Sequence, residues 1–324
     1  MAQRVPRTNR PRAFVSVSHD SRFVVIVGPT ASGKSELAAR LARRFGGEVI
    51  SVDSRQIYRG LAIGSAAVPV RPDARRGGFW YRGVRHHFIG EFPPRRAISA
   101  GEFAALAHAR MAEIRTRGRI PMLVGGSGFW LDAAASGIVL PAVPPNPKLR
   151  RALEKRLAAE LFRMLKRLDP RRAKTIDRQN PRRLIRAIEI ATALGRVPPL
   201  ERRADSDALW LGIRVGPSVL EQRIARRARA MVRHGLLNET RRLLQRVGRK
   251  RLLEFGFEYR LALDCLEGKL PRAALADAIT RSTKDYARRQ SQWFRTREQI
   301  RWIRTDTEAE RAVAQWLGLS ARRN

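Results

Sequence analysis

The stretch FVVIVGPTASGKS, from Phe23 to Ser35, places an apolar β-branched run before a glycine-rich turn and the start of an amphipathic helix. Its last eight residues fit the pattern G-x-x-x-x-G-K-[ST], whose two glycines let the backbone curl until successive N–H groups point inward. The N-terminus of the following helix adds positive potential. Because the motif stands between a predicted buried strand and a helix, it indicates a diphosphate-binding loop rather than an ordinary strand-to-helix turn.

Within this loop, Lys34 supplies a positive charge for phosphate oxygens, and the hydroxyl of Ser35 is a ligand that Mg²⁺ accepts. We therefore expect Mg²⁺ as cofactor, with Ser35 as its protein ligand. The loop does not say whose diphosphate it holds. The predicted diphosphate-binding residues are Gly28, Pro29, Thr30, Ala31, Ser32, Gly33, Lys34 and Ser35.

The composition favours a globular protein with a polyanionic partner. The length of 324 residues suggests one large or two modest domains, and a hydrophobic content of 44% is enough for a core. The formal net charge of +37 favours a nucleic acid partner over an ordinary enzyme whose arginine content follows its genome's base composition. The lone Cys265 suits a reducing compartment, so we expect a cytoplasmic protein. No apolar run approaches the ~20 residues of a membrane span.

Further strand-like runs follow the loop at 48–52, 120–124 and 209–215, separated by helical patterns. They predict an α/β fold: a P-loop NTPase-like core with a mainly parallel sheet, a helical insertion and C-terminal helices. We expect a basic, disordered tail over 1–22, the core over 23–140 and a basic helical insertion facing phosphates over 141–199. Residues 200–324 would return to the core and end in basic helices.

Polar side chains follow two of the predicted strands. Asp53 ends the second strand, and Ser127 lies in a glycine-rich turn after the third. In open α/β sheets ligands bind at this edge, so both are candidate catalytic residues. On local sequence alone, a plain glycine-rich turn around Ser127 is an equal alternative, and the His86-His87 pair is taken as structural.

Several short motifs occur in order along the chain: GPTASGKS at Gly28, ISVDSRQIYRG from Ile50, RHHFI from Arg85, RIPMLVGGSGFW from Arg119, NPRRLIRAIE from Asn180, LEG at Leu266 and YARRQSQWFR from Tyr286. Together they resemble the bacterial tRNA dimethylallyltransferases, the IPP transferase family. The resemblance covers nearly the whole chain, from about Phe23 to Arg304.

The resemblance implies transfer of a dimethylallyl group from dimethylallyl diphosphate to N6 of the adenosine at position 37 of tRNA, beside the anticodon. It implies that Asp53 is the general base and that Ser127 replaces a catalytic-site threonine. The partners would be the tRNA anticodon stem-loop and dimethylallyl diphosphate, and we expect a monomer. The implied tRNA-binding residues are Asp53, Ser54, Arg55, Gln56, Ser127, Arg150, Arg182, Arg183, Leu184, Ile185, Arg186, Arg251 and Gly256.

The chain departs from the family pattern in three places. The segment Ser65–Val68 lacks the family's usual lysine, and Gly90 stands where an aspartate is expected. Pro217-Ser218 replaces an Asp-Arg pair whose arginine helps hold diphosphate in the family. This leaves Arg214 or Arg223 as possible substitutes, and Arg223 is the one we assign to diphosphate binding.

Three other functions account for part of the pattern. An RNA-binding P-loop nucleotide kinase or ATPase explains the loop and the charge. It does not explain the sequence Asp53-Ser-Arg-Gln, and the strand at 120–124 runs into glycines rather than into the acidic Mg²⁺-holding residue of such enzymes. A basic RNA-binding protein with a relict loop fits the missing lysine and arginine. A transferase acting on free adenine nucleotides would not need the arginine-rich helices.

Overall fold

The computed structural model describes residues 21–135, 138–139, 141–199, 201–202 and 207–319. The chain divides into two compact units, one made of Met1–Ser136 with Asp205–Asn324 and the other of Gly137–Ala204. The tail expected to be disordered, 1–22, lies outside the described residues except for Ser21 and Arg22.

The larger unit is a mixed α/β structure with an eight-stranded sheet in the order β10-β9-β1-β6-β2-β5-β4-β3. Neighbouring strands from β10 to β5 run parallel, whereas at the far edge β4 pairs antiparallel with β5 and β3 pairs antiparallel with β4. This confirms a mixed α/β fold with a mainly parallel sheet. The strands are β1 (Phe23–Val27), β2 (Gly47–Val52), β3 (Arg71–Pro72), β4 (Phe79–Tyr81), β5 (Val84–His87), β6 (Ile120–Gly125), β9 (Ala208–Ile213) and β10 (Ile300–Ile303).

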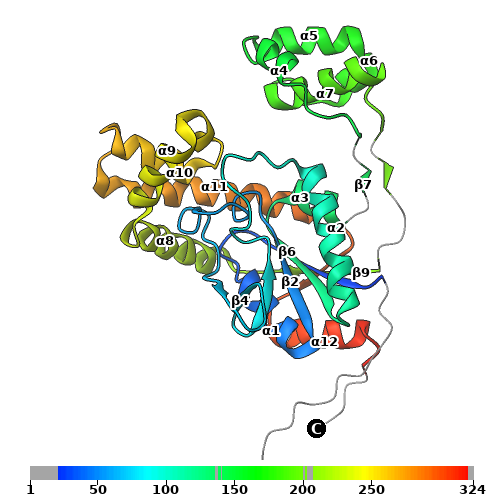
Figure 1. Ribbon diagram of the computed structural model, residues 1–324, viewed down its shortest axis with the longest axis vertical. Coiled ribbons are helices and arrows are strands. Elements are labelled where there is room, and N and C mark those ends of the chain that lie inside the picture. The colour runs from blue at the N-terminus through cyan, green and yellow to red at the C-terminus, as the bar shows by residue number, and fades with distance from the viewer. Residues whose placement is uncertain (1–20, 136–137, 140, 200, 203–206, 320–324) are drawn as a thin grey trace, which may run out of the picture. The chain divides into compact units, whose positions relative to one another are not determined.

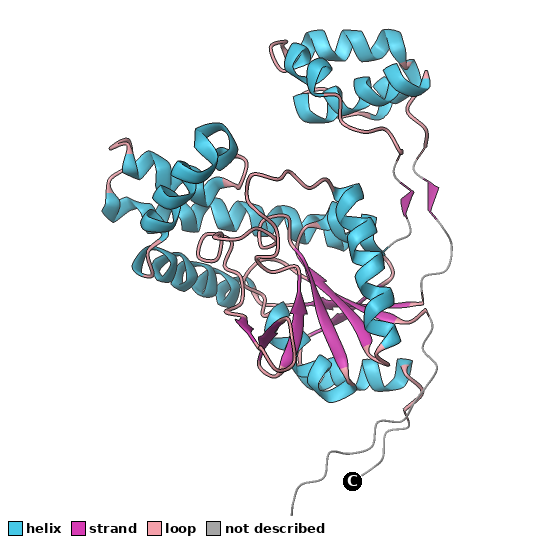
Figure 2. Ribbon diagram, viewed as in Figure 1, coloured by secondary structure: helices cyan, strands magenta, loops and turns pink. Residues whose placement is uncertain are grey.

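Both faces of the sheet are covered by helices, as Figures 1 and 2 show. Along β1, Val24 and Ile26 pack into one core with α1 (Lys34–Phe45) and α12 (Asp306–Trp316). The alternate residue Val25 packs into the other core, which includes α2 (Ala100–Thr116) and α3 (Gly128–Ala135). Burial on both faces explains why the central strand reads as a continuous apolar run.

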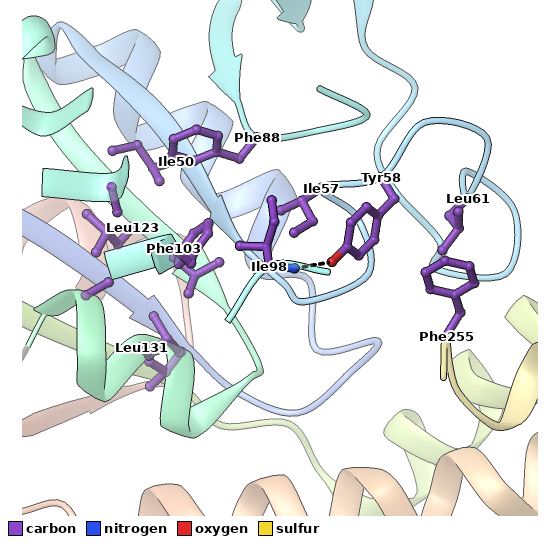
Figure 3. Packing of buried hydrophobic residues seen from close by; sticks show 14 of the residues in the cluster. Ile50, Ile57, Tyr58, Leu61, Phe88, Ile98, Phe103, Leu123, Leu131 and Phe255 are labelled. Atoms are coloured by element: carbon purple, nitrogen blue, oxygen red, sulfur yellow. Dashed lines mark hydrogen bonds between the residues drawn. The ribbon is translucent and has the colours of Figure 1, made fainter. Parts of the chain in front are cut away.

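The loop after β2 also contributes to the second core (Figure 3). Tyr58 and Leu61 are buried there, and the ring of Tyr58 lies 5.4 Å from that of Phe255 between centroids. The hydroxyl of Tyr58 accepts a hydrogen bond from the backbone N–H of Ile98 at 3.1 Å. These contacts fix the backbone that begins at Asp53.

The C-terminal helices of this unit pack on the same core as α2 and α3. The helical pattern breaks at Gly235: the residue has φ of 98°, and one helix ends before it while the next begins after it. Phe294 is buried, and Trp293 packs against the same core. The helices are α8 (Pro217–Arg233), α9 (Leu236–Leu253), α10 (Phe257–Leu266), a 3-10 turn at Arg272–Ala274 and α11 (Leu275–Arg295).

The smaller unit is helical apart from a two-stranded pair. Proline begins three of its helices, and Asn146, Asp169 and Asn180 cap those N-termini by accepting a hydrogen bond from a backbone N–H. Its core is built from leucine, isoleucine and alanine side chains. The elements are β7 (Ile138–Val139), α4 (Pro147–Leu153), α5 (Ala158–Leu168), α6 (Pro170–Thr175), α7 (Pro181–Leu194) and β8 (Glu201–Arg202).

Among the helices in the described ranges, none combines the length and the apolar character needed to cross a membrane.

Candidate functional site

The loop between β1 and α1 has the geometry that its sequence predicts. Gly33 stands just before α1 with φ of 97°, a conformation that glycine adopts without strain. The backbone N–H groups of Ala31, Gly33, Lys34 and Ser35 have no acceptor among the described residues. They are therefore available to an anion at the positive end of the helix.

A cavity of about 340 Å³ lies beside this loop, within the larger unit. Its wall combines the loop, the residues after β2, the segment 65–68, the end of β6 and two C-terminal helices. Of the predicted site residues, those that line it are Thr30, Ala31, Gly33, Lys34, Ser35, Asp53, Arg55 and Gln56. Gly28, Pro29 and Ser32 shape the loop from outside the lining.

Two cations, Lys34 and Arg227, line the cavity. Lys34 donates a hydrogen bond through Nζ to the carbonyl oxygen of Pro29 at 2.6 Å. Burial, and secondarily the charge of Arg227, lower the pKa of Lys34 to about 7, while Asp53 acts in the opposite direction. Burial also lowers the pKa of Arg227, followed by repulsion from Arg55. Burial and, after it, a neighbouring positive charge oppose the charged form of each side chain, and a bound anion would favour that form.

Arg227, on α8, is the second of these cations. Its guanidinium donates to the hydroxyl of Thr30 and to the carbonyl oxygen of Ala66, both at 3.1 Å. In the described part of the chain it forms no ion pair with a carboxylate. Glu258 and Asp53 favour its charged form only from a distance, so a guanidinium that burial disfavours is positioned for an anionic ligand.

The predicted diphosphate residue Arg223 lies one helical turn earlier and is exposed. It donates to the carbonyl oxygen of Ser32 at 3.3 Å and does not line the cavity. The other candidate, Arg214, stacks over Trp302 at 5.8 Å. Arg223 and Arg227 are four residues apart and share one face of α8, and of the two it is Arg227 that lines the cavity.

Asp53 presents a carboxylate to the same cavity. Its Oδ1 accepts hydrogen bonds from the backbone N–H groups of Arg55, at 2.9 Å, and Gln56, at 3.3 Å. No donor among the described residues binds Oδ2. The carboxylate is therefore oriented through one oxygen while the other can accept a proton from a substrate.

Arg55 and Gln56 hold the segment that carries Asp53. Arg55 pairs with the buried Glu258 on α10. Burial lowers the pKa of Arg55, but Glu258, Asp53 and Tyr286 raise it, and the net shift is upward. Gln56 accepts from the hydroxyl of Ser51 at 3.0 Å and donates to the carbonyl oxygen of Ser65 at 3.2 Å.

Ser54 lies between Asp53 and Arg55 in the chain. It is half-buried and does not line the cavity.

Ser127 follows β6 at the start of α3, half-buried and just outside the lining. The neighbouring cavity residue is Tyr286, on α11. Burial and then Asp53 raise the pKa of Tyr286, while Arg55 and a hydrogen bond with Ser127 lower it. Ser127 is therefore connected to the cavity through its hydrogen bond with Tyr286.

Glu239, on α9, holds the wall segment that contains Ser65 and Ala66. Its buried carboxylate accepts from the backbone N–H groups of Ile63 and Gly64, at 2.9 and 2.8 Å, and from the hydroxyl of Tyr259 at 2.8 Å. A buried carboxylate with three donors is well compensated.

The two adjacent histidines, on β5, have different surroundings. His87 Nε2 lies 2.7 Å from the carboxylate of Glu48, which also pairs with Arg117. Burial opposes ionisation of Glu48, but the hydrogen bonds from these two residues bring its pKa down to about 2. The structural role expected for the pair therefore fits His87.

His86 lines the cavity. Its Nδ1–H donates to the carbonyl oxygen of Val84 at 3.1 Å, because a carbonyl can only accept. Burial lowers the pKa of His86 to about 4, so the ring is neutral near pH 7 and Nε2 is an acceptor.

The expected tRNA-binding residue Arg251 is engaged within the larger unit. It donates to the carbonyl oxygens of Pro94 and Arg96, at 2.9 and 2.8 Å, and stacks over Phe255 at 4.7 Å. Gly256 lies before α10 with φ of 114°, and a Cβ there would approach Arg55 to 2.9 Å. In this arrangement both residues support the segments that surround the cavity.

In the smaller unit, Arg150 pairs with the buried Glu189 through two hydrogen bonds of 2.7 Å. Arg186 donates to the same carboxylate at 3.3 Å and to the carbonyl oxygen of Val143 at 2.8 Å. The side chains of Arg150 and Arg186 therefore stabilise the fold of this unit.

The other expected RNA contacts lie at the beginning of α7. Arg182 and Arg183 are exposed. Leu184 and Ile185 are buried in the core of the unit, so direct RNA contact is not open to their side chains. The helical period turns the two arginines outward and the two apolar residues inward.

Sequence reasoning missed Arg227, Glu239, Glu258 and Gln290 as site residues. Arg227 stands among five arginines between 223 and 233 of α8, and nothing but three-dimensional context distinguishes it. For Glu239 and Glu258 the sequence offered only a weak indication, namely that acidic residues are scarce in so basic a chain. Gln290 lay within a motif of the family resemblance without an assigned role.

The fold and the site together define the class of this protein. It is a mixed α/β protein with an anion-binding loop and a free carboxylate at the carboxyl edge of a parallel sheet. A family model described as IPP transferase matches residues 56–297, and one described as isopentenyl transferase matches residues 21–73. Since the first spans more than half of the chain, this protein belongs to the IPP transferase family.

Similar proteins span nearly the same length. The tRNA dimethylallyltransferase of Acidothermus cellulolyticus is 38% identical over 313 residues, covering 91% of this chain and 94% of the relative. That of Roseiflexus sp. strain RS-1 is 39% identical over 315 residues, covering 91% and 98%.

Solved structures show the same fold. The full-length tRNA isopentenylpyrophosphate transferase from Bacillus halodurans matches with a TM-score of 0.67 and 32% identity, covering 92% of this chain and 97% of that one. A eukaryotic dimethylallyltransferase acting on tRNA matches with a TM-score of 0.72 over 91% of this chain and 78% of that one. At 23% identity, the second likeness concerns the fold alone.

Proposed function

We propose that this protein transfers a dimethylallyl group from dimethylallyl diphosphate to N6 of the adenosine at position 37 of tRNA. The observation that carries the proposal is the meeting, in one cavity, of the Lys34 and Arg227 cations and the carboxylate of Asp53. Family membership and the tRNA dimethylallyltransferase relatives support the same reaction.

The diphosphate would bind to the loop between β1 and α1, which acts as a P-loop of the kind found in nucleotide-binding proteins. The free N–H groups of Ala31, Gly33, Lys34 and Ser35 donate to its oxygens. The side chains of Lys34 and Arg227, both in the cavity lining, balance its charge. These groups stabilise the leaving diphosphate because its charge grows as the bond to carbon breaks.

The proton would leave the adenine amine through Asp53. As N6 attacks the allylic carbon C1, the C1–O bond breaks and diphosphate departs with the bonding electrons. The amine proton passes to Oδ2 of Asp53, while Oδ1 stays bound to the N–H groups of Arg55 and Gln56. Proton removal by such a positioned base contributes about 10²–10⁴-fold to a rate.

The donor set is compatible with Mg²⁺. Ser35 supplies a hydroxyl at the start of α1, in the cavity lining, and magnesium sites commonly combine few protein ligands with substrate phosphates. No group of three or more His, Cys, Asp or Glu side chains that could hold a metal occurs in the part of the chain that the structure describes. When bound, Mg²⁺ would neutralise charge on the diphosphate, and the hydroxyl of Ser35 would be the protein ligand of the ion.

The RNA would be held largely by arginines. The net charge of +37 supplies a strong, salt-dependent attraction to phosphates, and Arg182 and Arg183 offer exposed guanidinium groups on a folded helix. The adenosine must leave its stack to bring N6 to Asp53. We also propose that the protein acts as a monomer in the cytoplasm.

The alternative, an RNA-binding nucleotide kinase or ATPase, is not favoured by the comparisons. Transfer of a γ-phosphoryl group needs a residue that orients the nucleophile and, usually, a second acidic Mg²⁺ holder. In the described cavity lining the acidic residues are Asp53 and the exposed Glu36. Binding of a diphosphate donor requires neither of these additional parts.

The test is to incubate the full chain with dimethylallyl diphosphate, Mg²⁺ and bulk tRNA without ATP, and to analyse the tRNA nucleosides by mass spectrometry. We expect N6-dimethylallyl adenosine to appear and diphosphate to be released in equal amount. Calorimetry should show tighter binding of dimethylallyl diphosphate than of ATP. Tight ATP binding with γ-phosphate release and unmodified tRNA would establish the kinase or ATPase instead.

A further inference from the structure

Gln290, on α11, joins the two loops that follow the neighbouring strands β1 and β6. Its Oε1 accepts a hydrogen bond from the backbone N–H of Thr30 at 2.8 Å, and its Nε2 donates to the carbonyl oxygen of Gly126 at 2.8 Å. The side chain is 7% exposed and lines the cavity. Since both ends of the amide are engaged, its orientation is fixed.

The approach to Gly126 is close enough to demand glycine. A Cβ at this position would lie 2.2 Å from Nε2 of Gln290, well inside van der Waals contact. The turn after β6 and the side chain of Gln290 are therefore fitted to one another. This makes Gln290 a cross-link between the anion-binding loop and the turn that continues into Ser127.

The bond to Thr30 also decides which donors the loop keeps for a ligand. Pro29 has no N–H, that of Thr30 is taken by Gln290, and that of Ser32 donates to the carbonyl oxygen of Pro29 at 3.2 Å. The free N–H groups begin with Ala31 and otherwise stand at Gly33 and in the first turn of α1. The anion-binding donors are thus gathered at the helix end of the loop.

We propose that Gln290 is a specificity-determining residue that limits the site to two phosphates by withdrawing the Thr30 N–H from the ligand. A third phosphate brings further oxygens that require donors, and in this loop the next backbone donor is already bound to protein. Gln290 acts on the ligand through Thr30, so it is a positioning residue. The inference rests on the proposed diphosphate site.

The test compares inorganic diphosphate with inorganic triphosphate by calorimetry, in Mg²⁺ and moderate salt. Gln290→Met removes both hydrogen bonds at similar volume, and Gln290→Ala removes them while leaving space. Gln290→Glu keeps an acceptor for Thr30 but loses the donor to Gly126. Gln292→Met is the control, because Gln292 lies exposed on the same helix. Circular dichroism establishes that each variant is folded.

We expect the wild type to prefer diphosphate. Gln290→Met and Gln290→Ala should lower the ratio of the triphosphate to the diphosphate dissociation constant by about tenfold, the effect of one hydrogen bond to a charged group. Gln290→Glu and Gln292→Met should not lower it. A general loss of structure would instead weaken the binding of both ligands together. It would also change the dissociation constants of the Gln290→Met and Gln290→Glu variants alike.

Two results would overturn the inference in distinguishable ways. If the wild type binds diphosphate saturably and the ratio stays the same in the Met and Ala variants, Gln290 does not set the chain length, while the diphosphate site stands. If the wild type shows no saturable diphosphate binding, the proposed site fails and the role of Gln290 fails with it.

Discussion

Arg227 donates a hydrogen bond to the hydroxyl of Thr30 at 3.1 Å, although the two residues are 197 positions apart in the chain. The contact ties α8 to the anion-binding loop, and Arg227 joins Lys34 as a second cation in the cavity lining. The family's arginine near Ser218 is absent here, yet the cavity still contains a guanidinium. The loss of that arginine therefore does not leave the diphosphate with Lys34 as its only cationic side chain.

Replacing Arg227 tests its assignment to the diphosphate. Arg227→Met should raise the dissociation constant of dimethylallyl diphosphate by about tenfold to a hundredfold, because a charge-assisted contact is lost from a half-buried site. Arg223→Met, one turn earlier and exposed, should change it by less than about threefold. Calorimetry measures both. Equal effects of the two substitutions would contradict the placement of Arg227 as the diphosphate arginine.

The lowered pKa of Lys34 predicts a pH-dependent affinity for diphosphate. The pKa is about 7 in the free protein and must rise when an anion binds, so binding takes up a proton above pH 7. The dissociation constant should therefore be flat below pH 7 and increase by up to about tenfold per pH unit above it.

Lys34→Arg is the comparison, since a guanidinium keeps its charge across this range. The titration of the ligand is common to the wild type and the variant, so the difference between their curves isolates the ionisation of Lys34. Parallel curves for the wild type and the Lys34→Arg variant between pH 6 and 9 would show that Lys34 is already fully protonated in this range.

The arginines of the smaller unit should separate into two groups. Arg182→Ala with Arg183→Ala should weaken tRNA binding and reduce the slope of log K against log salt by about one per lost phosphate contact. Arg150→Ala should instead lower stability, because it leaves Glu189 with weaker compensation in a buried site. Filter binding at several salt concentrations and thermal unfolding measure the two effects. An unaltered salt slope in the double variant would remove Arg182 and Arg183 from the RNA interface.

Glu239 should be important for both stability and the shape of the cavity. Glu239→Gln turns an amide N–H₂ toward one of three donors, so we expect the free energy of unfolding to fall by about 1–3 kcal/mol. Dimethylallyl diphosphate should also bind more weakly, since the segment 63–66 contains the Ala66 carbonyl that holds Arg227. The exposed Glu221→Gln, which loses only a surface pair with Lys284, is the control for denaturant unfolding. Matching unfolding curves for both variants would contradict this role of Glu239.

The sequence predicted the parts of the fold that have a strong local pattern. The runs at 23–27, 48–52, 120–124 and 209–215 are apolar enough to be recognised as strands, and all four occur in the parallel sheet. β5 was missed because its residues Val84–His87 are mostly basic. β10 was missed because four residues, Ile300–Ile303, are too few to establish a period.

The same distinction applies to the site residues, some of which a local pattern predicts and some of which it does not. Lys34, Ser35 and Asp53 could be predicted because a motif or a strand end fixes where they lie. Arg227 and Gln290 could not be assigned, because their roles depend on which turn of α8 or α11 faces the loop. The arginine-rich composition increased the difficulty, since Arg150, Arg186 and Arg251 are engaged in internal contacts that a count of charges cannot separate from RNA contacts.

Single-turnover transfer by the Asp53→Asn variant tests most directly whether Asp53 takes the proton from the adenine amine beside the bound diphosphate. Asparagine keeps the shape and can still accept from Arg55 and Gln56, but it is not a base. We predict that transfer from enzyme-bound dimethylallyl diphosphate to tRNA slows by about 10²–10⁴-fold while both dissociation constants change little. An unchanged single-turnover rate would contradict the assignment of Asp53 as the base.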